Sequence, residues 1–283
     1  MSAGPGIAAR AEREGLLPAF AAVRERFGLV ALLVALGGVA WWSTAHRMAG
    51  MDAGPGTDLG ELRWFVGVWV VMMAAMMFPA VSPTVALYAR MARRQPHAAP
   101  LAFTSGYLLV WTAIGLVAYG LFDAVRAALG PELAWDRAGQ WVAAGVVLVA
   151  AVYELTPMKD VCLSKCRSPL GFLLGAWRSG LSGALQMGIR HGAWCLGCCW
   201  ALMAALFALG VMSLAWMAFV AALISVEKIL PWKRVATYGT AALLLVLGVL
   251  LVAAPAAIPG LTIPGSDRGA PAMMHGGMEM GGP

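Results

Sequence analysis

A histidine, three cysteines and a methionine stand in one short stretch at a spacing that suits metal binding. His191, Cys195, Cys198, Cys199 and Met203 occupy positions i, i+4, i+7, i+8 and i+12, so in a helix they share one face. Imidazole, thiolate and thioether ligands select Cu(I), Zn(II) and similar ions over Mg²⁺ or Ca²⁺. We therefore interpret this stripe as a metal site, although Cys and Met also serve as apolar fillers at helix interfaces.

Two further cysteines, Cys162 and Cys166, form a C-x3-C pair upstream of this stripe, and the chain has no cysteine outside these two groups. In a reducing cytosol such thiols are free or metal-bound rather than joined as structural disulfides. We predict that this pair shares one metal site with Cys195 and Cys198. Cys199, turned by about 100° from Cys198 on a helix, is expected to contribute less.

A methionine-rich run precedes these cysteines. It reads Met-Met-Ala-Ala-Met-Met-Phe-Pro over residues 72–79, and we propose Met73, Met76 and Met77 as a mid-membrane relay for a soft ion. Ordinary core packing is the competing interpretation, since methionine is an adaptable apolar filler. Pro79 and Pro83 are expected to break the backbone ladder and to free carbonyl groups beside a cavity or a neighbouring helix.

Two acidic residues and a tail complete the candidate site. Glu154 and Glu227 fall near the ends of apolar runs, where an ionisable group is costly and is by default functional or paired. Glu227 has Lys228 beside it, so an ion pair between these two is the alternative. Met274 and His275, in the Met/His/Gly/Pro-rich tail, are candidate outer ligands.

Composition places the chain in a membrane. It has 283 residues, of which 61% are hydrophobic and only 12% charged, about half the charged fraction of a soluble domain. The prediction is an all-α, polytopic transmembrane helix bundle with about seven spans and one interfacial or re-entrant helix at 168–186. The spans are expected at about 27–42, 62–89, 101–122, 140–155, 189–209, 214–230 and 235–254.

Charge distribution sets the orientation. With residues 1–26 in the cytoplasm, fifteen of the 20 Lys and Arg residues fall on the cytoplasmic side, which is a positive-inside bias. The helical domain then covers 27–254, and the disordered tail 255–283 lies outside the bacterial inner membrane. The basic residues form no patch or stripe, so no nucleic-acid partner is expected.

Four blocks of this sequence together resemble a known family. They are the methionine run through Pro83, the stretch Pro-Met-Lys-Asp-Val-Cys-Leu-Ser-Lys-Cys-Arg-Ser-Pro at 157–169, the block His-Gly-Ala-Trp-Cys-Leu-Gly-Cys-Cys-Trp-Ala-Leu-Met at 191–203, and Glu227-Lys228. These look like the bacterial predicted metal-binding integral membrane proteins of unknown function, over roughly residues 64–250. The resemblance implies metal binding in a membrane domain, and assigns neither an ion nor an activity.

The resulting expectation is a membrane protein that handles a soft metal, with Cu(I) first and Zn(II) second, for transport, storage or delivery. Its partners would be the lipid bilayer, the metal ion and a metallochaperone or membrane metalloenzyme. No ATP-binding loop is present, so ATP-driven pumping is unsupported and an enzyme is not favoured. Two alternatives stay open: a membrane thiol-disulfide oxidoreductase using these cysteines, and a non-catalytic assembly factor for a membrane metalloenzyme.

Overall fold

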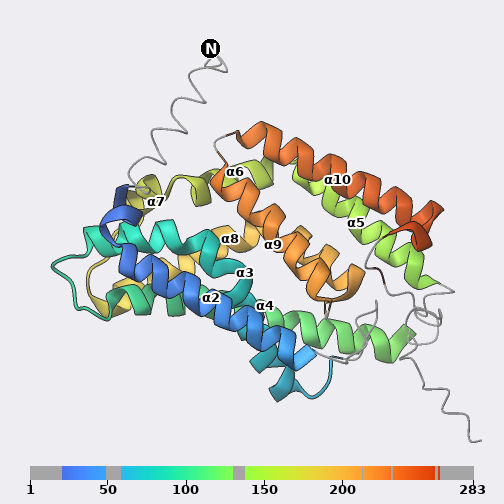
Figure 1. Cartoon of the computed structure of the whole chain (residues 1–283), viewed down its shortest axis with the longest axis horizontal. Coiled ribbons are helices and arrows are strands. Elements are labelled where there is room, and N and C mark those ends of the chain that lie inside the picture. Colours follow the sequence, from blue (N-terminus) through green and yellow to red (C-terminus); the bar gives the residue numbers. More distant parts are fainter. Residues whose placement is uncertain are drawn as a thin grey trace, which may run out of the picture.

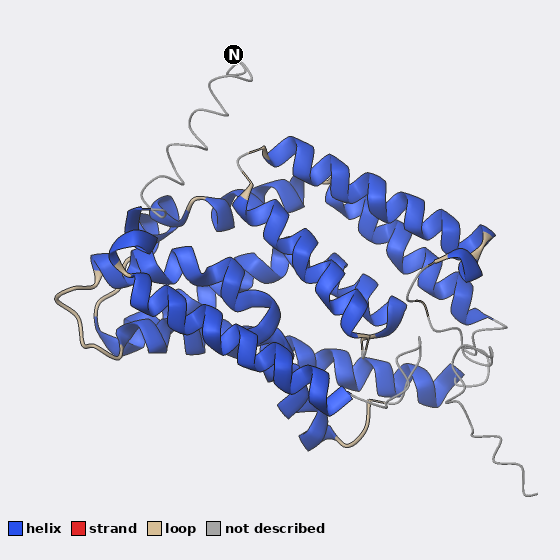
Figure 2. Ribbon diagram, viewed as in Figure 1, coloured by secondary structure: helices blue, strands red, loops and turns tan. Residues whose placement is uncertain are grey.

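The computed structural model describes residues 21–48, 59–129, 138–211, 213–230, 232–258 and 261, and all regular elements in these ranges are helices (Figure 2). The predicted all-α class is confirmed for this part of the chain. The helices, labelled in Figure 1, are α2 (Phe27–Met48), α3 (Leu62–Met91), α4 (Ala99–Leu129), α5 (Gln140–Glu154), α6 (Pro157–Arg167), α7 (Pro169–Ala176), α8 (Gly180–Gly210), α9 (Leu214–Ile229), α10 (Lys233–Ala253) and the short 3-10 helix η3 (Pro255–Ala257).

Five of these helices are long and apolar enough to cross a membrane, namely α2, α3, α4, α8 and α10. A sixth crossing is added if α5 and α6, which meet at 68°, are counted together. The predicted seven spans are therefore not confirmed by length and composition. At about 1.5 Å per residue, the 15 residues of α5 and the 16 of α9 are shorter than a hydrocarbon core of about 30 Å.

The outer surface of the bundle is apolar, as a lipid-facing surface must be. The side chains of Val39, Leu121 and Val149 are 60%, 64% and 59% exposed. Such side chains recur along several helices, whereas a soluble monomer rarely exposes contiguous apolar surface on this scale. The structure is compatible with a multi-pass membrane protein.

The segment 168–186 differs from its prediction. Instead of one interfacial helix followed by a span from Ile189, the chain forms the short α7 and then a single continuous α8 that begins at Gly180. Gly183 lies inside α8 without interrupting it, and Gly188, just beyond the segment, lies at a contact with another helix. A Cβ at Gly188 would overlap the carbonyl oxygen of Phe103 in α4, so this glycine permits close packing rather than ending a helix.

Glycine packing joins α4 to α8 along their first halves. Gly106 of α4 faces the main chain of Leu185, and a Cβ at Gly192 of α8 would lie only 3.1 Å from the carbonyl oxygen of Tyr107. Small residues let two membrane helices approach backbone to backbone. These contacts fix the helix that carries the cysteine stripe.

The two prolines of α3 leave carbonyls that are satisfied locally. Pro79 has no N–H to donate to the carbonyl of Ala75, and the indole Nε1 of Trp41 in α2 donates to that oxygen at 3.1 Å. Pro83 similarly frees the carbonyl of Pro79, which accepts from Ser82 Oγ at 2.9 Å. Both prolines therefore release a carbonyl from the helical hydrogen-bond pattern, as expected. The helix nevertheless continues through both prolines.

A sharp corner separates α5 from α6. Pro157 occupies the first turn of α6, where a missing N–H costs nothing, and Thr156 caps this turn by accepting from the backbone N–H of Lys159 at 3.3 Å. The corner points Lys159 inward, where its side chain is fully buried. On the N-terminal side of the corner, α5 lies against α10 (Figure 1).

Candidate metal centre

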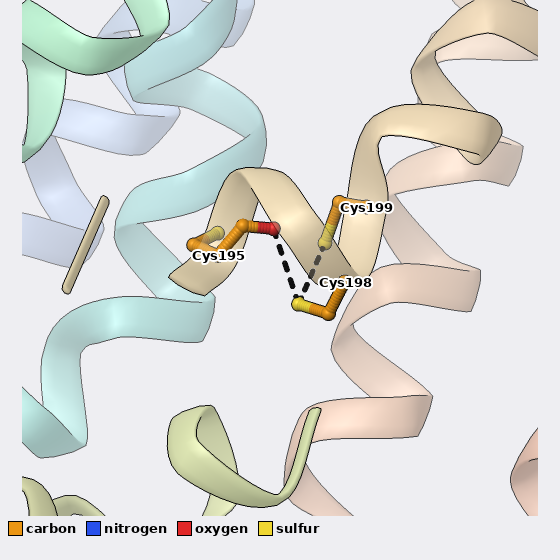
Figure 3. Close-up of side chains that lie close together, drawn as sticks. All are labelled: Cys195, Cys198 and Cys199. Carbon is orange, nitrogen blue, oxygen red and sulfur yellow. Dashed lines mark hydrogen bonds between the residues drawn. The ribbon is translucent and has the colours of Figure 1, made fainter. Parts of the chain in front are cut away.

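Three cysteine sulfurs gather on one side of α8 (Figure 3). The Sγ atoms of Cys195, Cys198 and Cys199 all lie within 4.8 Å of one another and are buried. Cys198 Sγ is 3.4 Å from Cys199 Sγ and 3.1 Å from the carbonyl oxygen of Cys195. A metal bonded to sulfur at about 2.3 Å needs its sulfur ligands roughly 3.8–4.0 Å apart, so small side-chain rotations would form a ligand set. Cys199, which we expected to contribute less, belongs to this cluster.

A fourth sulfur comes from α6, which packs against α8. Cys166 Sγ lies 3.7 Å from Cys198 Sγ, and both side chains are buried. The other α6 cysteine, Cys162, lies against Gly197, where a Cβ would come within 2.7 Å of its sulfur. We predicted that the two cysteine pairs approach each other, and Cys166 does lie beside Cys198. For Cys162, the structure shows a packing contact with Gly197.

Two polar side chains from other helices contact Cys195. The Lys228 Nζ atom of α9 is 2.9 Å from Cys195 Sγ, and the Tyr107 hydroxyl of α4 is 3.0 Å from the same sulfur. An ammonium group hydrogen-bonded to sulfur stabilises negative charge on it. Four helices, α4, α6, α8 and α9, thus meet at this cluster.

The model of the PpoB2 family, described as copper chaperone, matches residues 66–251. This chain belongs to that family. The matched range contains all four clustered cysteines, Tyr107 and Lys228. No curated protein and no solved structure matches the chain. The expectation of a metal-related family is confirmed at this level, and membership in the PpoB2 family adds copper to what the sulfur geometry indicates.

In this PpoB2-family chain, His191 is buried beside the cysteines but outside their cluster. Its ring lies among those of Phe103, Tyr107 and Phe172, with centroid distances of 5.9, 6.0 and 5.0 Å. Its Nδ1 has no hydrogen-bond partner among the described residues. The histidine therefore retains an unused donor or acceptor one helical turn from Cys195, and its role as a ligand stays a prediction.

The methionines proposed as ligands on α3 and α8 are inside the protein. Met73, Met76 and Met77 are almost fully buried in α3, which packs mainly on α2 and α4. This buried position is compatible both with a relay for a soft ion and with ordinary core packing. Met203 borders a cavity of about 440 Å³ between α3, α4, α5 and α8, which is lined by aliphatic and aromatic side chains, including Trp200.

Glu227 does not pair with its sequence neighbour Lys228, which was the alternative considered from the sequence. Glu227 bonds to Lys159, at 2.7 Å, while its sequence neighbour Lys228 points to Cys195. Consecutive residues on a helix point about 100° apart, so the two members of Glu227-Lys228 serve different clusters. Lys159 also bonds to Glu154, in a buried group of three charged side chains.

Sequence reasoning missed Tyr107 and Lys159. Tyr107 sits in an apolar run with no pattern that distinguishes it from other aromatic residues. Lys159 did carry a pattern, because it falls in the first turn after Pro157 and five residues beyond Glu154. Met274 and His275 lie outside the described residues, so their role stays a prediction.

Proposed function

We propose that this chain is a membrane-embedded copper chaperone that holds Cu(I) between α8 and α6 and passes it to a protein partner. The observation that carries this proposal is a buried set of four sulfurs from two helices: Cys195, Cys198 and Cys199 on α8, and Cys166 on α6. Thiolates select Cu(I) strongly, and the family description is that of a copper chaperone.

Lys228 would offset part of the negative charge of a thiolate-bound Cu(I). Three or four thiolates around one Cu(I) leave a net negative charge, which is costly in an apolar interior. The ammonium of Lys228, 2.9 Å from Cys195 Sγ, offsets part of that charge. Lys228 is thus proposed as a neighbour that stabilises the loaded site without binding the metal.

The thiol-disulfide alternative is less well supported. Exchange requires a thiolate that a second protein's disulfide can reach, whereas Cys195, Cys198 and Cys199 are at most 1% exposed. The assembly-factor alternative merges with the proposal, because a chaperone that delivers copper to a membrane metalloenzyme performs that task. His191, Met203 and the α3 methionines are proposed as transient ligands during transfer.

Metal loading tests the proposed function. Purified protein kept reduced and without oxygen is titrated with Cu(I) against a competing chelator, and we expect one Cu(I) per chain. X-ray absorption of the loaded protein should show a shell of sulfur at about 2.3 Å, and bound copper should protect the buried thiols from alkylation. Failure to compete for Cu(I), or tighter retention of Zn(II) than of Cu(I), would contradict the proposal.

We also propose seven crossings, with a cytoplasmic N-terminus in the bacterial inner membrane. The contacts of Gly188 with Phe103 and of Gly192 with Tyr107, four residues further along both helices, indicate that α4 and α8 run in the same direction. Two parallel spans begin on the same side, so the chain between them must cross back, and α5 is the segment placed to do so. The parallel directions of α4 and α8 thus favour a crossing by α5 that helix length alone does not indicate.

The antiparallel pairing of α5 with α10 supports the last crossing. Gln140 at the start of α5 donates to the carbonyl of Leu251 near the end of α10, at 2.7 Å. With α8 and α10 both directed outward, α9 must return between them. A reporter active only in the periplasm and fused after Gly265 is therefore expected to be active. Activity of a cytoplasmic reporter at that position would contradict either the seven crossings or the cytoplasmic N-terminus.

A further inference from the structure

A second buried cluster, separate from the sulfurs, joins three helices at the corner between α5 and α6. It consists of Glu154 at the end of α5, Lys159 in the first turn of α6 and Glu227 in α9, which are 2%, 0% and 1% exposed. Lys159 Nζ donates to Glu154 Oε2 and, at 2.7 Å, to Glu227 Oε2. Two acidic groups therefore share one ammonium group in the interior of the bundle.

Each carboxyl group keeps one oxygen without a partner. Glu154 Oε1 and Glu227 Oε1 are both buried and accept no hydrogen bond from the described residues, and the other oxygen of each carboxyl group bonds to the same Lys159 Nζ. Leaving an ionised carboxylate oxygen unsatisfied in an apolar environment costs several kcal/mol. Two carboxylates that share a site avoid this cost when one of them keeps its proton.

The other polar side chains around this cluster direct their described hydrogen bonds elsewhere. Arg167 of α6 donates to the main-chain oxygens of Glu227 and Leu230, which closes the C-terminal end of α9. Tyr153 of α5 donates to the carbonyl of Gly197, and Lys228 of α9 donates to Cys195 Sγ. In the described hydrogen bonds, Lys159 is thus the cation that bonds directly to the two carboxyl groups.

We propose that the Glu154–Lys159–Glu227 cluster is a proton-binding site that holds one exchangeable proton shared by the two carboxyl groups. One group is then a carboxylic acid whose O–H donates to the unpartnered oxygen of the other. The remaining carboxylate and the ammonium of Lys159 balance in charge. This site adjoins the sulfur cluster, because Glu227 and Lys228 are consecutive on α9, but its existence does not rest on copper binding.

Infrared spectroscopy of metal-free protein tests the proposal. At neutral pH ordinary Asp and Glu side chains are ionised, so a carboxylic acid C=O stretch reports a buried proton, and its shift in D₂O shows that the proton exchanges. We expect this band in the wild type and its loss in both Glu154→Gln and Glu227→Gln, since a single carboxylate balances Lys159. The exposed Glu61 provides the matched control, and Glu61→Gln should retain the band.

Lys159→Met gives the opposite prediction. Without the ammonium group both carboxyl groups should be protonated, so the band should roughly double in area. Thermal unfolding of each variant in detergent establishes that it is folded, and the two glutamine variants serve independently if Lys159→Met does not fold. Absence of the band in the wild type, or its persistence in both glutamine variants, would overturn the proton-binding site while leaving the copper site untouched.

Discussion

Replacing Cys198 by serine is expected to abolish stoichiometric Cu(I) binding by the purified protein. Cys198 is the central sulfur of the cluster, 3.4 Å from Cys199 Sγ and 3.7 Å from Cys166 Sγ, so its loss separates the α8 ligands from the α6 ligand. Serine is nearly isosteric but supplies a hard oxygen, which a soft ion disfavours. Cu(I) competition against a chelator should show a fall in affinity of at least a hundredfold.

Cys162→Ser is the matched control, because it makes the same atomic change in the α6 helix that carries Cys166. Cys162 packs against Gly197, and the described hydrogen bonds of the cluster reach α6 through Cys166, so we expect this variant to keep its copper affinity within a few-fold. Equal losses in both variants would return Cys162 to the ligand set, as the C-x3-C spacing first indicated. Full affinity in Cys198→Ser would exclude the sulfur cluster as the copper site.

Replacing Gly188 by alanine should destabilise the fold. A Cβ at this position would overlap the carbonyl oxygen of Phe103, and backbone atoms cannot move aside as a flexible side chain can. Forcing atoms into a well-packed contact costs about 1–3 kcal/mol, so the temperature of unfolding in detergent should fall.

Gly239→Ala in α10 is the control for this change. No atom lies within 4 Å of a Cβ at Gly239, and alanine in a helix interior is favoured over glycine by up to about 1 kcal/mol. One added methyl group is therefore expected to lower the temperature of unfolding at Gly188 and to raise it at Gly239. Equal or higher stability of Gly188→Ala would mean that α4 and α8 are not packed backbone to backbone.

Part of the fold was predictable from the sequence because long apolar runs report directly on long apolar helices. The stripe from His191 to Met203 was readable because helical periodicity places its members on one face. Three of its cysteines do cluster. The continuous α8 was not predictable, because a glycine at a helix contact and a glycine at a helix break look alike in one sequence.

The partners contributed by other helices were harder to infer. Tyr107 and Lys228 contact Cys195 only because α4 and α9 pack on either side of it. Sequence proximity paired Glu227 with Lys228, whereas the corner at Pro157 brings Lys159 to Glu227 instead. Such tertiary pairings depend on crossing angles and on the direction of each helix, neither of which a hydropathy pattern encodes.

The close glycine contact between α4 and α8 has a consequence for how an ion would leave the proposed site. Three sulfurs belong to α8, which cannot slide or rotate against α4 without a collision between backbones. The fourth, from Cys166, belongs to an 11-residue helix that joins its neighbours at the Thr156-Pro157 corner and at Ser168. If Cys166 is a ligand as proposed, we expect release to proceed by a small hinge motion of α6, which would remove this sulfur and leave an open face where a partner's thiol could replace it.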